Sequence, residues 1–260
     1  MPTRRARPAA PPRFFRAIGA VLAAAIFLAP PALAASGSSG LDLLPSGKGA
    51  GASGAPLQIL LLLTALAVLP AVIMCVTPFL RITVVLHFLR QALGTQSTPS
   101  NQVLIGLSLF LSFLIMQPIV NDVYSNAWKP LEEGTITSAQ AFEQGSKPVK
   151  SFLIRFAREK DIRLMLELTH APAPARPADL GLDVLVPAYI LSELKTGFQI
   201  GAILYLPFLI IDLIVASVTL SVGMVQLPPV MISAPFKILL FVLVDGWNLV
   251  IGSLMRSFNQ

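Results

Sequence analysis

Four ionisable side chains lie inside or beside two long apolar stretches in the second half of the chain. They are Glu193, Asp212, Lys237 and Asp245. An ionisable group at membrane depth costs about 2.5–3.5 kcal/mol on insertion scales, so each is expected to face protein or water rather than lipid. Two kinds of chemistry suit such groups, structural ion pairs and a proton relay. The residue types leave both open.

The spacing of Asp212 and Lys237 bears on how the two could pair. If Leu227 is taken as the tip of a helical hairpin, Asp212 lies fifteen residues before the tip and Lys237 ten residues after it. Two straight helices would then stagger the side chains by roughly 7 Å along the axis. The sequence therefore predicts pairing between neighbouring copies as readily as pairing within one chain.

The remaining polar residues give no support to enzymatic chemistry. His87 and His170 lie in different regions, and neither stands in a cluster of Cys, Asp or Glu, which argues against a metal site. The sequence contains neither a nucleophile elbow nor a phosphate-binding loop. We predict a protein that is not an enzyme and that uses no cofactor or metal.

Apolar helices must position the four ionisable groups. Of the 260 residues, 55% are hydrophobic and 12% are charged, which is too apolar for an ordinary soluble domain. Several runs are long enough to cross a hydrocarbon core as helices. Four membrane-type helices are predicted, at about residues 57–77, 103–120, 200–222 and 238–255. The predicted fold is an all-α membrane protein with two helical hairpins, 57–120 and 186–260.

The connection inside the first hairpin is basic, with Arg81, His87 and Arg90 among apolar residues. Positive charge favours the cytoplasmic side, so segment 121–185 is expected on the periplasmic side as an inserted helical domain. Within it, residues 151–170 have the period of one amphipathic helix. Its apolar side would carry Phe152, Phe156, Leu164 and Leu168.

The start of the chain has the composition of a targeting segment. Residues 1–34 combine a basic beginning, a short apolar core and an Ala-Leu-Ala cleavage sequence, which predicts a cleavable signal peptide. Five arginines in this segment supply most of the formal net charge of +6, so the mature chain would be nearly neutral. That balance argues against nucleic-acid binding. Residues 35–56 are rich in Gly and Ser and are predicted to be a flexible linker.

Two glycines one helical turn apart, Gly197 and Gly201, precede the third membrane-type run. Small residues at this spacing let two helix backbones approach closely. We predict packing between copies of the chain at this position. The alternative is that the two glycines are incidental.

Several short motifs occur in one order along the chain. They are Thr77-Pro78-Phe79, Phe88-Leu89-Arg90-Gln91-Ala92-Leu93-Gly94, Arg158-Glu159-Lys160-Asp161, Ser192-Glu193-Leu194-Lys195, Gly223-Met224, Pro228-Pro229, Pro235-Phe236-Lys237 and Val244-Asp245-Gly246-Trp247. In these motifs the chain resembles the FliP/SctR family of type III secretion export-gate proteins. The resemblance covers nearly all of the chain from about Leu57.

The resemblance implies a channel subunit through which unfolded flagellar proteins cross the inner membrane at the flagellar basal body. It implies about five copies that assemble with FliQ and FliR into a right-handed helical cone, in which the hairpins are largely lifted out of the bilayer plane. Because the family energises export through other components, it favours ion pairs over a proton relay. The alternatives are the homologous injectisome subunit and a small-solute channel or transporter.

The resemblance also suggests a pore-lining role for Met224, Val225 and Gln226. In the family a run of methionines at the hairpin tip is thought to seal the narrowest part of the channel as a gasket. Flexible methionine side chains can deform around varied substrates. Here Met224 is followed by Val225, which can still seal, and by Gln226, which introduces an amide. The alternative is ordinary packing of the hairpin.

Overall fold

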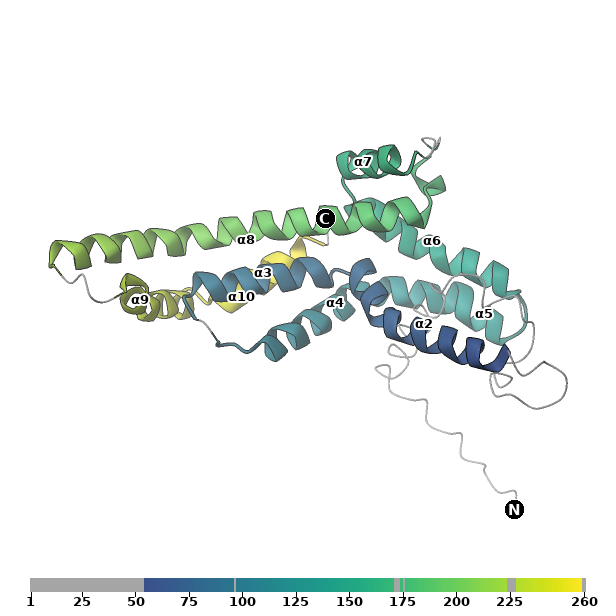
Figure 1. The fold of residues 1–260 in the computed structure, drawn as a ribbon, viewed down its shortest axis with the longest axis horizontal. Coiled ribbons are helices and arrows are strands. Elements are labelled where there is room, and N and C mark those ends of the chain that lie inside the picture. Colours follow the sequence, from purple (N-terminus) through teal and green to yellow (C-terminus); the bar gives the residue numbers. More distant parts are fainter. Residues whose placement is uncertain (1–53, 96, 171–173, 175, 224–227, 259–260) are drawn as a thin grey trace, which may run out of the picture. The chain divides into compact units, whose positions relative to one another are not determined.

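A computed structural model describes residues 54–95, 97–170, 174, 176–223 and 228–258 (Figure 1). The predicted signal peptide, 1–34, and nearly all of the predicted linker, 35–56, lie outside the described residues. The described residues form helices and contain no strand. The prediction of an all-α membrane protein is confirmed.

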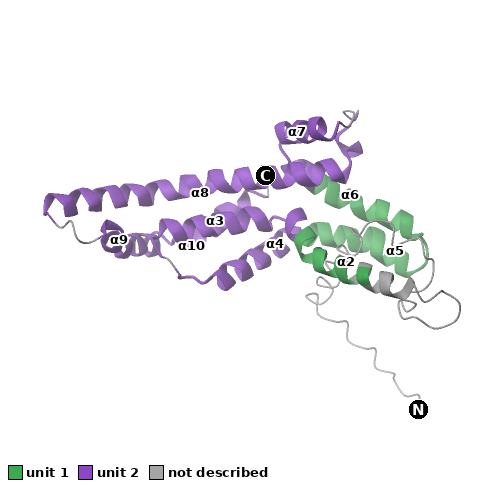
Figure 2. Cartoon of the chain, viewed as in Figure 1, with its two compact units in different colours: residues 1–73, 117–152 green, residues 74–116, 153–260 purple. Residues whose placement is uncertain are grey.

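The chain divides into two compact units (Figure 2). Among the described residues, 54–73 and 117–152 belong to the first unit, and those within 74–116 and 153–258 belong to the second. The boundary after Phe152 divides the segment 121–185, which was predicted as one inserted domain. Residues on the two sides of this boundary belong to different units.

The first unit is built from parts of longer helices. It holds most of α2 (Gly54–Val76), the end of α4 (Asn101–Val123), a π-helical turn (Tyr124–Trp128), α5 (Lys129–Glu132) and most of α6 (Ser138–Phe156). Gly145 of α6 lies against the π-helical turn, because a Cβ added there would be 3.2 Å from the Cβ of Ala127. A small residue at this position therefore lets the two segments approach closely.

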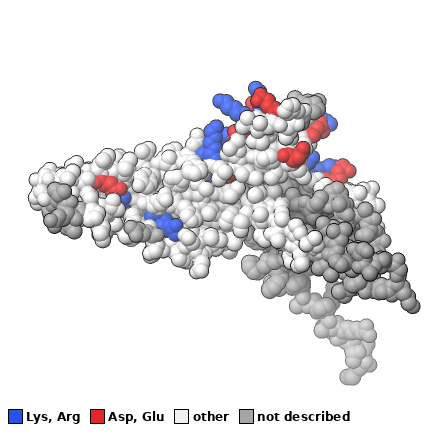
Figure 3. All heavy atoms as spheres, in the orientation of Figure 1, with Lys and Arg blue, Asp and Glu red and all other residues white. Residues whose placement is uncertain are grey.

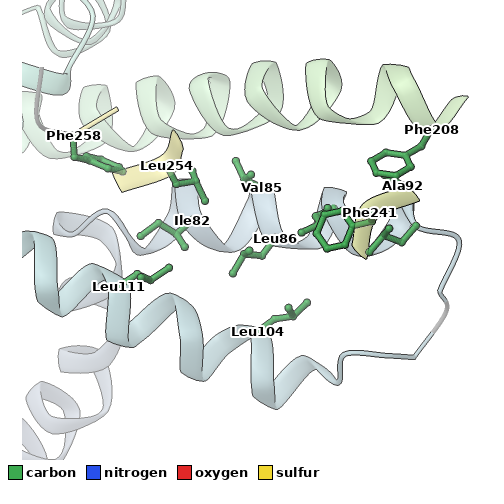
Figure 4. Close-up of a cluster of buried hydrophobic side chains, with 12 residues drawn as sticks. Ile82, Val85, Leu86, Ala92, Leu104, Leu111, Phe208, Phe241, Leu254 and Phe258 are labelled. Carbon is green, nitrogen blue, oxygen red and sulfur yellow. The ribbon is translucent and has the colours of Figure 1, made fainter. Parts of the chain in front are cut away.

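The second unit has an apolar core between α3 (Phe79–Ala92) and α8 (Leu182–Ser221), which pack side by side. Residues of α4, α9 (Pro229–Leu243) and α10 (Gly246–Arg256) complete it. Figure 4 shows the side chains that meet there. They include Ile82, Val85, Leu86, Leu104, Leu111, Phe208, Phe241, Leu254 and Phe258. Helix α3 contributes the most because its apolar residues recur every three or four positions along one face.

Residues 151–170 form two helices rather than the single amphipathic helix predicted. Helix α6 ends at Phe156 and α7 (Glu159–Thr169) begins after Arg158, which has an extended backbone with φ −74° and ψ 138°. The backbone N–H of Arg158 donates to the hydroxyl of Ser192 at 2.9 Å, so a tertiary contact holds the break. Leu168 is 65% exposed instead of lying on a shared apolar side.

The second hairpin also differs from two straight spans. Helix α8 is continuous over 40 residues and includes the segment predicted to precede its membrane run. The predicted span 238–255 is shared by α9 and α10, which meet at a bend of 65°. Asp245 at the bend is left-handed, with φ 51°. A Cβ on Gly246 would lie 2.2 Å from the ring of Phe241, so this tight corner needs a glycine.

By length and composition, two helical segments could cross a membrane, Asn101–Glu132 and Leu182–Ser221. The number rises to four if each of two bent helix pairs is one span. One pair is Leu66–Val76 with Phe79–Ala92, and the other is Pro229–Leu243 with Gly246–Arg256. Among the described residues, the four predicted spans therefore correspond to two continuous helices and two bent pairs.

Candidate functional site

The first candidate feature is a buried ion pair that joins α3 to α8. The guanidinium of Arg81 donates from Nε to Oε2 of Glu193 at 2.9 Å and from Nη2 to Oε1 of the same carboxylate. The side chains of Arg81 and Glu193 are 4% and 0% exposed. Two parallel N–H···O bonds use the planar geometry of both groups, which makes this the stronger form of an ion pair. The predicted buried charge at Glu193 therefore has its partner within the same chain.

Sequence reasoning missed Arg81, which it treated as one of three basic residues in a cytoplasmic connection. The helix shows why it is buried, because Arg81 is four residues before Val85 and one before Ile82, both fully buried. An arginine inside the apolar period of a helix is a signal for a buried partner. Glu193 lies between Ser192 and Leu194 and is the acid that pairs with Arg81.

The residue before Glu193 makes a second polar link, from α8 to α7. Ser192 is fully buried, and its hydroxyl donates to Oδ2 of Asp161 at 2.7 Å while it accepts the backbone N–H of Arg158 at 2.9 Å. The Arg158 guanidinium also donates to Thr196 at 3.0 Å. Adjacent residues of α8 thus hold α7 on one side and α3 on the other.

The second candidate feature is an ion pair that joins α8 to α9. Nζ of Lys237 lies 2.6 Å from Oδ2 of Asp212, and Ser233 donates to the other carboxylate oxygen at 2.5 Å. Lys237 is 1% exposed and Asp212 is 21% exposed. Pairing is therefore formed within one chain. Counted from the helix ends, Asp212 lies nine residues before Ser221 and Lys237 eight residues after Pro229, so the predicted stagger nearly vanishes.

Asp245 is not buried, contrary to the sequence-based prediction. It is exposed at the bend between α9 and α10, and its carboxylate accepts a hydrogen bond from Nδ2 of Asn248 at 3.2 Å. The apolar run around it suggested the middle of a span. The helix break instead places Asp245 just before the first turn of α10, where a negative charge is favourable.

The predicted pore residues Met224, Val225 and Gln226 lie outside the described residues. Within the described ranges there is no group of three or more His, Cys, Asp or Glu side chains that could hold a metal ion. Among the described residues, the candidate site therefore consists of the two ion pairs and the helix packing beside them.

Gly197 and Gly201 pack within the chain, against α3, rather than between copies as predicted. A Cβ on Gly197 would lie 3.2 Å from Val84, and one on Gly201 would lie 2.6 Å from Cγ of Phe88. Both glycines are buried. The absence of side chains on this face of α8 allows the close approach that brings Glu193 to Arg81.

Replacing Gly201 with alanine is expected to destabilise the chain by about 1–3 kcal/mol. The new Cβ would meet Cβ and Cγ of Phe88, which are close to the backbone and cannot swing away. Thermal unfolding in detergent would measure the change. Gly106→Ala is the matched control, because Gly106 is also helical and a Cβ there meets nothing within 4 Å. The control should stabilise slightly, by roughly 0.5–1 kcal/mol. Equal effects of the two substitutions would contradict the packing role.

The sequence profile of the FliP family matches residues 62–254. The chain belongs to this family. It is 50% identical over 201 residues to the flagellar biosynthetic protein FliP of Pectobacterium carotovorum, covering 77% of this chain and 78% of that protein. The FliP of Bacillus subtilis is 49% identical over 201 residues, with 77% and 91% coverage. The FliP of Caulobacter vibrioides is 44% identical over 245 residues, with 94% and 91% coverage.

Both ion pairs lie within the part of the chain that matches the FliP family. Arg81, Glu193, Asp212 and Lys237 all fall between residues 62 and 254. The residues after α10 that contact Arg81, Ser257 and Phe258, follow the matched range. The family profile therefore includes the two ion pairs but not every residue that surrounds them.

Proposed function

We propose that the chain is a core subunit of the flagellar type III protein export gate, which passes unfolded flagellar proteins across the inner membrane. The observation that carries this proposal is its membership of the FliP family, together with relatives that are named flagellar biosynthetic proteins. Those names favour the flagellar gate over the homologous injectisome. Substrate proteins and partners are part of the proposal.

The surface of the second hairpin supports an assembled state. Figure 3 shows most of the charged side chains on this face gathered over α7 and the nearby end of α8, with only a few toward the α8–α9 hairpin. Many of its large apolar side chains are at least half exposed. They include Ile203, Leu206, Ile210, Leu213, Val218, Leu239, Val242 and Leu243. An apolar surface of this extent needs lipid or other protein chains to cover it.

We propose that this apolar surface is buried in an assembly of about five copies with FliQ and FliR, as the family resemblance implies. In this proposal the protein is a multi-pass protein of the inner membrane within the flagellar basal body, and segment 121–185 is periplasmic. Met224, Val225 and Gln226 would line the narrowest part of the channel. Supporting the membrane location are two helical segments that are long and apolar enough to span, or four with the bent pairs.

The two ion pairs are proposed to be structural rather than part of a proton relay or a solute transport site. Each acid is already engaged by a cation from a neighbouring helix, Glu193 by Arg81 and Asp212 by Lys237. A carboxylate whose oxygens bind a cation of a neighbouring helix joins the two helices. This arrangement suits a fixed scaffold around a channel.

Deletion of the gene from the bacterium that carries it should test the proposed function. We expect the deletion to abolish swimming and to remove hook and filament proteins from the culture medium, with both restored by a plasmid copy. Immunoblots of the medium and of whole cells would measure export separately from synthesis. A deletion strain that swims and exports these proteins normally would overturn the proposal. Loss of protein delivery to host cells with normal swimming would favour the injectisome.

A further inference from the structure

The end of the described chain closes over the buried Arg81. Helix α10 ends at Arg256, and the next residue, Ser257, accepts a hydrogen bond from Nη1 of Arg81 at 3.2 Å. Ser257 is itself fixed, because its hydroxyl donates to the carbonyl of Leu254 at 2.7 Å and its backbone N–H donates to the carbonyl of Ser253 at 3.0 Å. The acceptor that faces Arg81 is therefore held by α10.

Phe258 covers a face of the same guanidinium. Its ring centroid lies 4.0 Å from Cζ of Arg81 and 5.3 Å from the ring centroid of Phe156. The side chain is 4% exposed and lies at one end of the apolar core (Figure 4). An arginine over an aromatic face is attracted to the ring quadrupole, most strongly where water is excluded. Phe258 supplies both the attraction and the exclusion of water.

Together these contacts surround Arg81 from three directions. The carboxylate of Glu193 takes Nε and Nη2, the hydroxyl of Ser257 takes Nη1, and the ring of Phe258 covers a face. Each of these contacts offsets part of the cost of burying the guanidinium, because an N–H or face without a partner carries a desolvation cost. Glu193 provides only the contacts of Nε and Nη2.

We propose that Ser257 and Phe258 form a latch that positions the Arg81–Glu193 pair and so fixes α3 against α8. Ser257 and Phe258 are positioning residues, acting through Arg81. They are synthesised after every other residue around Arg81, so the ion pair is sealed only once α10 has docked. The latch concerns the fold of the chain itself and does not depend on the proposed export function.

A double-mutant cycle separates the latch from ordinary apolar packing by Phe258. Phe258→Leu keeps an apolar side chain but removes the aromatic face, and Ser257→Ala removes the hydroxyl. Each would be made in the native chain and in a chain in which Arg81→Met and Glu193→Leu replace the ion pair. Melting temperatures of the purified proteins in one detergent would be compared, with Phe236→Leu on the 57% exposed Phe236 as the aromatic control.

In the native background each latch substitution is expected to lower the melting temperature by about 2–4 °C. In the background without the ion pair, Ser257→Ala should have almost no effect and Phe258→Leu should keep only its smaller packing loss, because the charge on which both act is gone. The control Phe236→Leu should be equally small in both backgrounds. Equal losses from Phe258→Leu in the two backgrounds would overturn the latch, since Phe258 would then be packing only.

If the chain with Arg81→Met and Glu193→Leu does not fold, hydrogen exchange tests the latch in variants that keep the ion pair. Phe258→Leu, and a chain ended at Arg256, should speed exchange of backbone amides in α3 and around Glu193 by about 5–30-fold. Amides of α9 should be unchanged and serve as the internal reference. Uniform acceleration throughout the second unit, or none in α3, would overturn the latch. Both measurements use the purified chain, so their failure is distinct from failure of the proposed function.

Discussion

Replacing Glu193 with alanine is expected to lower the free energy of unfolding by about 3–5 kcal/mol. The substitution would leave the guanidinium of Arg81, which is 4% exposed, without the carboxylate that binds two of its nitrogens. An uncompensated buried charge is costly because neither water nor another anion replaces the lost partner. Denaturation of the detergent-purified protein would measure the loss, with lower accumulation in membranes as a second readout.

Two further variants make the Glu193 prediction specific. Glu159→Ala removes the acid of a surface ion pair with Arg163, whose side chains are 79% and 71% exposed, and should cost no more than about 1 kcal/mol. Combining Arg81→Met with Glu193→Leu should recover most of the lost stability, because an apolar pair of similar volume leaves no charge unpaired. If Glu193→Ala behaved like Glu159→Ala, the ion pair would not hold α3 on α8.

The sequence was sufficient to predict the helical fold and the family. Long apolar runs require helices at membrane depth, and the motifs, in their order along the chain, are those of the FliP family. Helix ends were less predictable where a tertiary contact decides them. The break after Phe156 depends on Ser192, which is 34 residues beyond Arg158 and supplies the acceptor for its backbone N–H. No local pattern contains that information.

The ion-pair partners of the charged residues also could not be predicted from local sequence patterns. Glu193 and Arg81 are 112 positions apart in the sequence. The sequence predicts Asp212 and Lys237 as a possible pair. Their predicted offset along the hairpin axis assumes that both helices continue to a single tip at Leu227. Because α8 ends at Ser221 and α9 begins at Pro229, the two groups are almost level. Asp245 is exposed because the chain bends at Gly246. The apolar run around Asp245 gives no sign of this bend in the sequence.

Both paired acids lie on α8, and their cations come from different helices. Glu193 binds Arg81 of α3, and Asp212, nineteen residues later, binds Lys237 of α9. At the rise of an α-helix, the two acids are roughly 28 Å apart along the axis. Directional hydrogen bonds between charged groups tolerate less sliding than apolar contacts, so in the proposed structural role the two pairs would fix the register of α3 and α9 on α8.

Replacing Asp212 with alanine is expected to destabilise the α8–α9 hairpin by about 3–5 kcal/mol. Lys237, which is 1% exposed, would lose its carboxylate, and the Ser233 hydroxyl would lose the nearer of its two acceptors. In a membrane-type helix the unpaired ammonium has no inexpensive alternative partner. We expect a marked fall in the amount of assembled protein recovered from membranes, measured by native electrophoresis and by export into the medium.

Exchanging the two charges distinguishes a structural pair from a proton relay. The double variant Asp212→Lys with Lys237→Asp restores the attraction between α8 and α9, so assembly and export should recover substantially relative to either single substitution. Asp212→Asn keeps an acceptor for Ser233 but has no charge. If the pair is structural, export should fall by the same fraction as the amount of assembled protein. Normal assembly of Asp212→Asn with abolished proton-coupled export would instead assign Asp212 to proton transfer, because only the titratable carboxyl would then be missing.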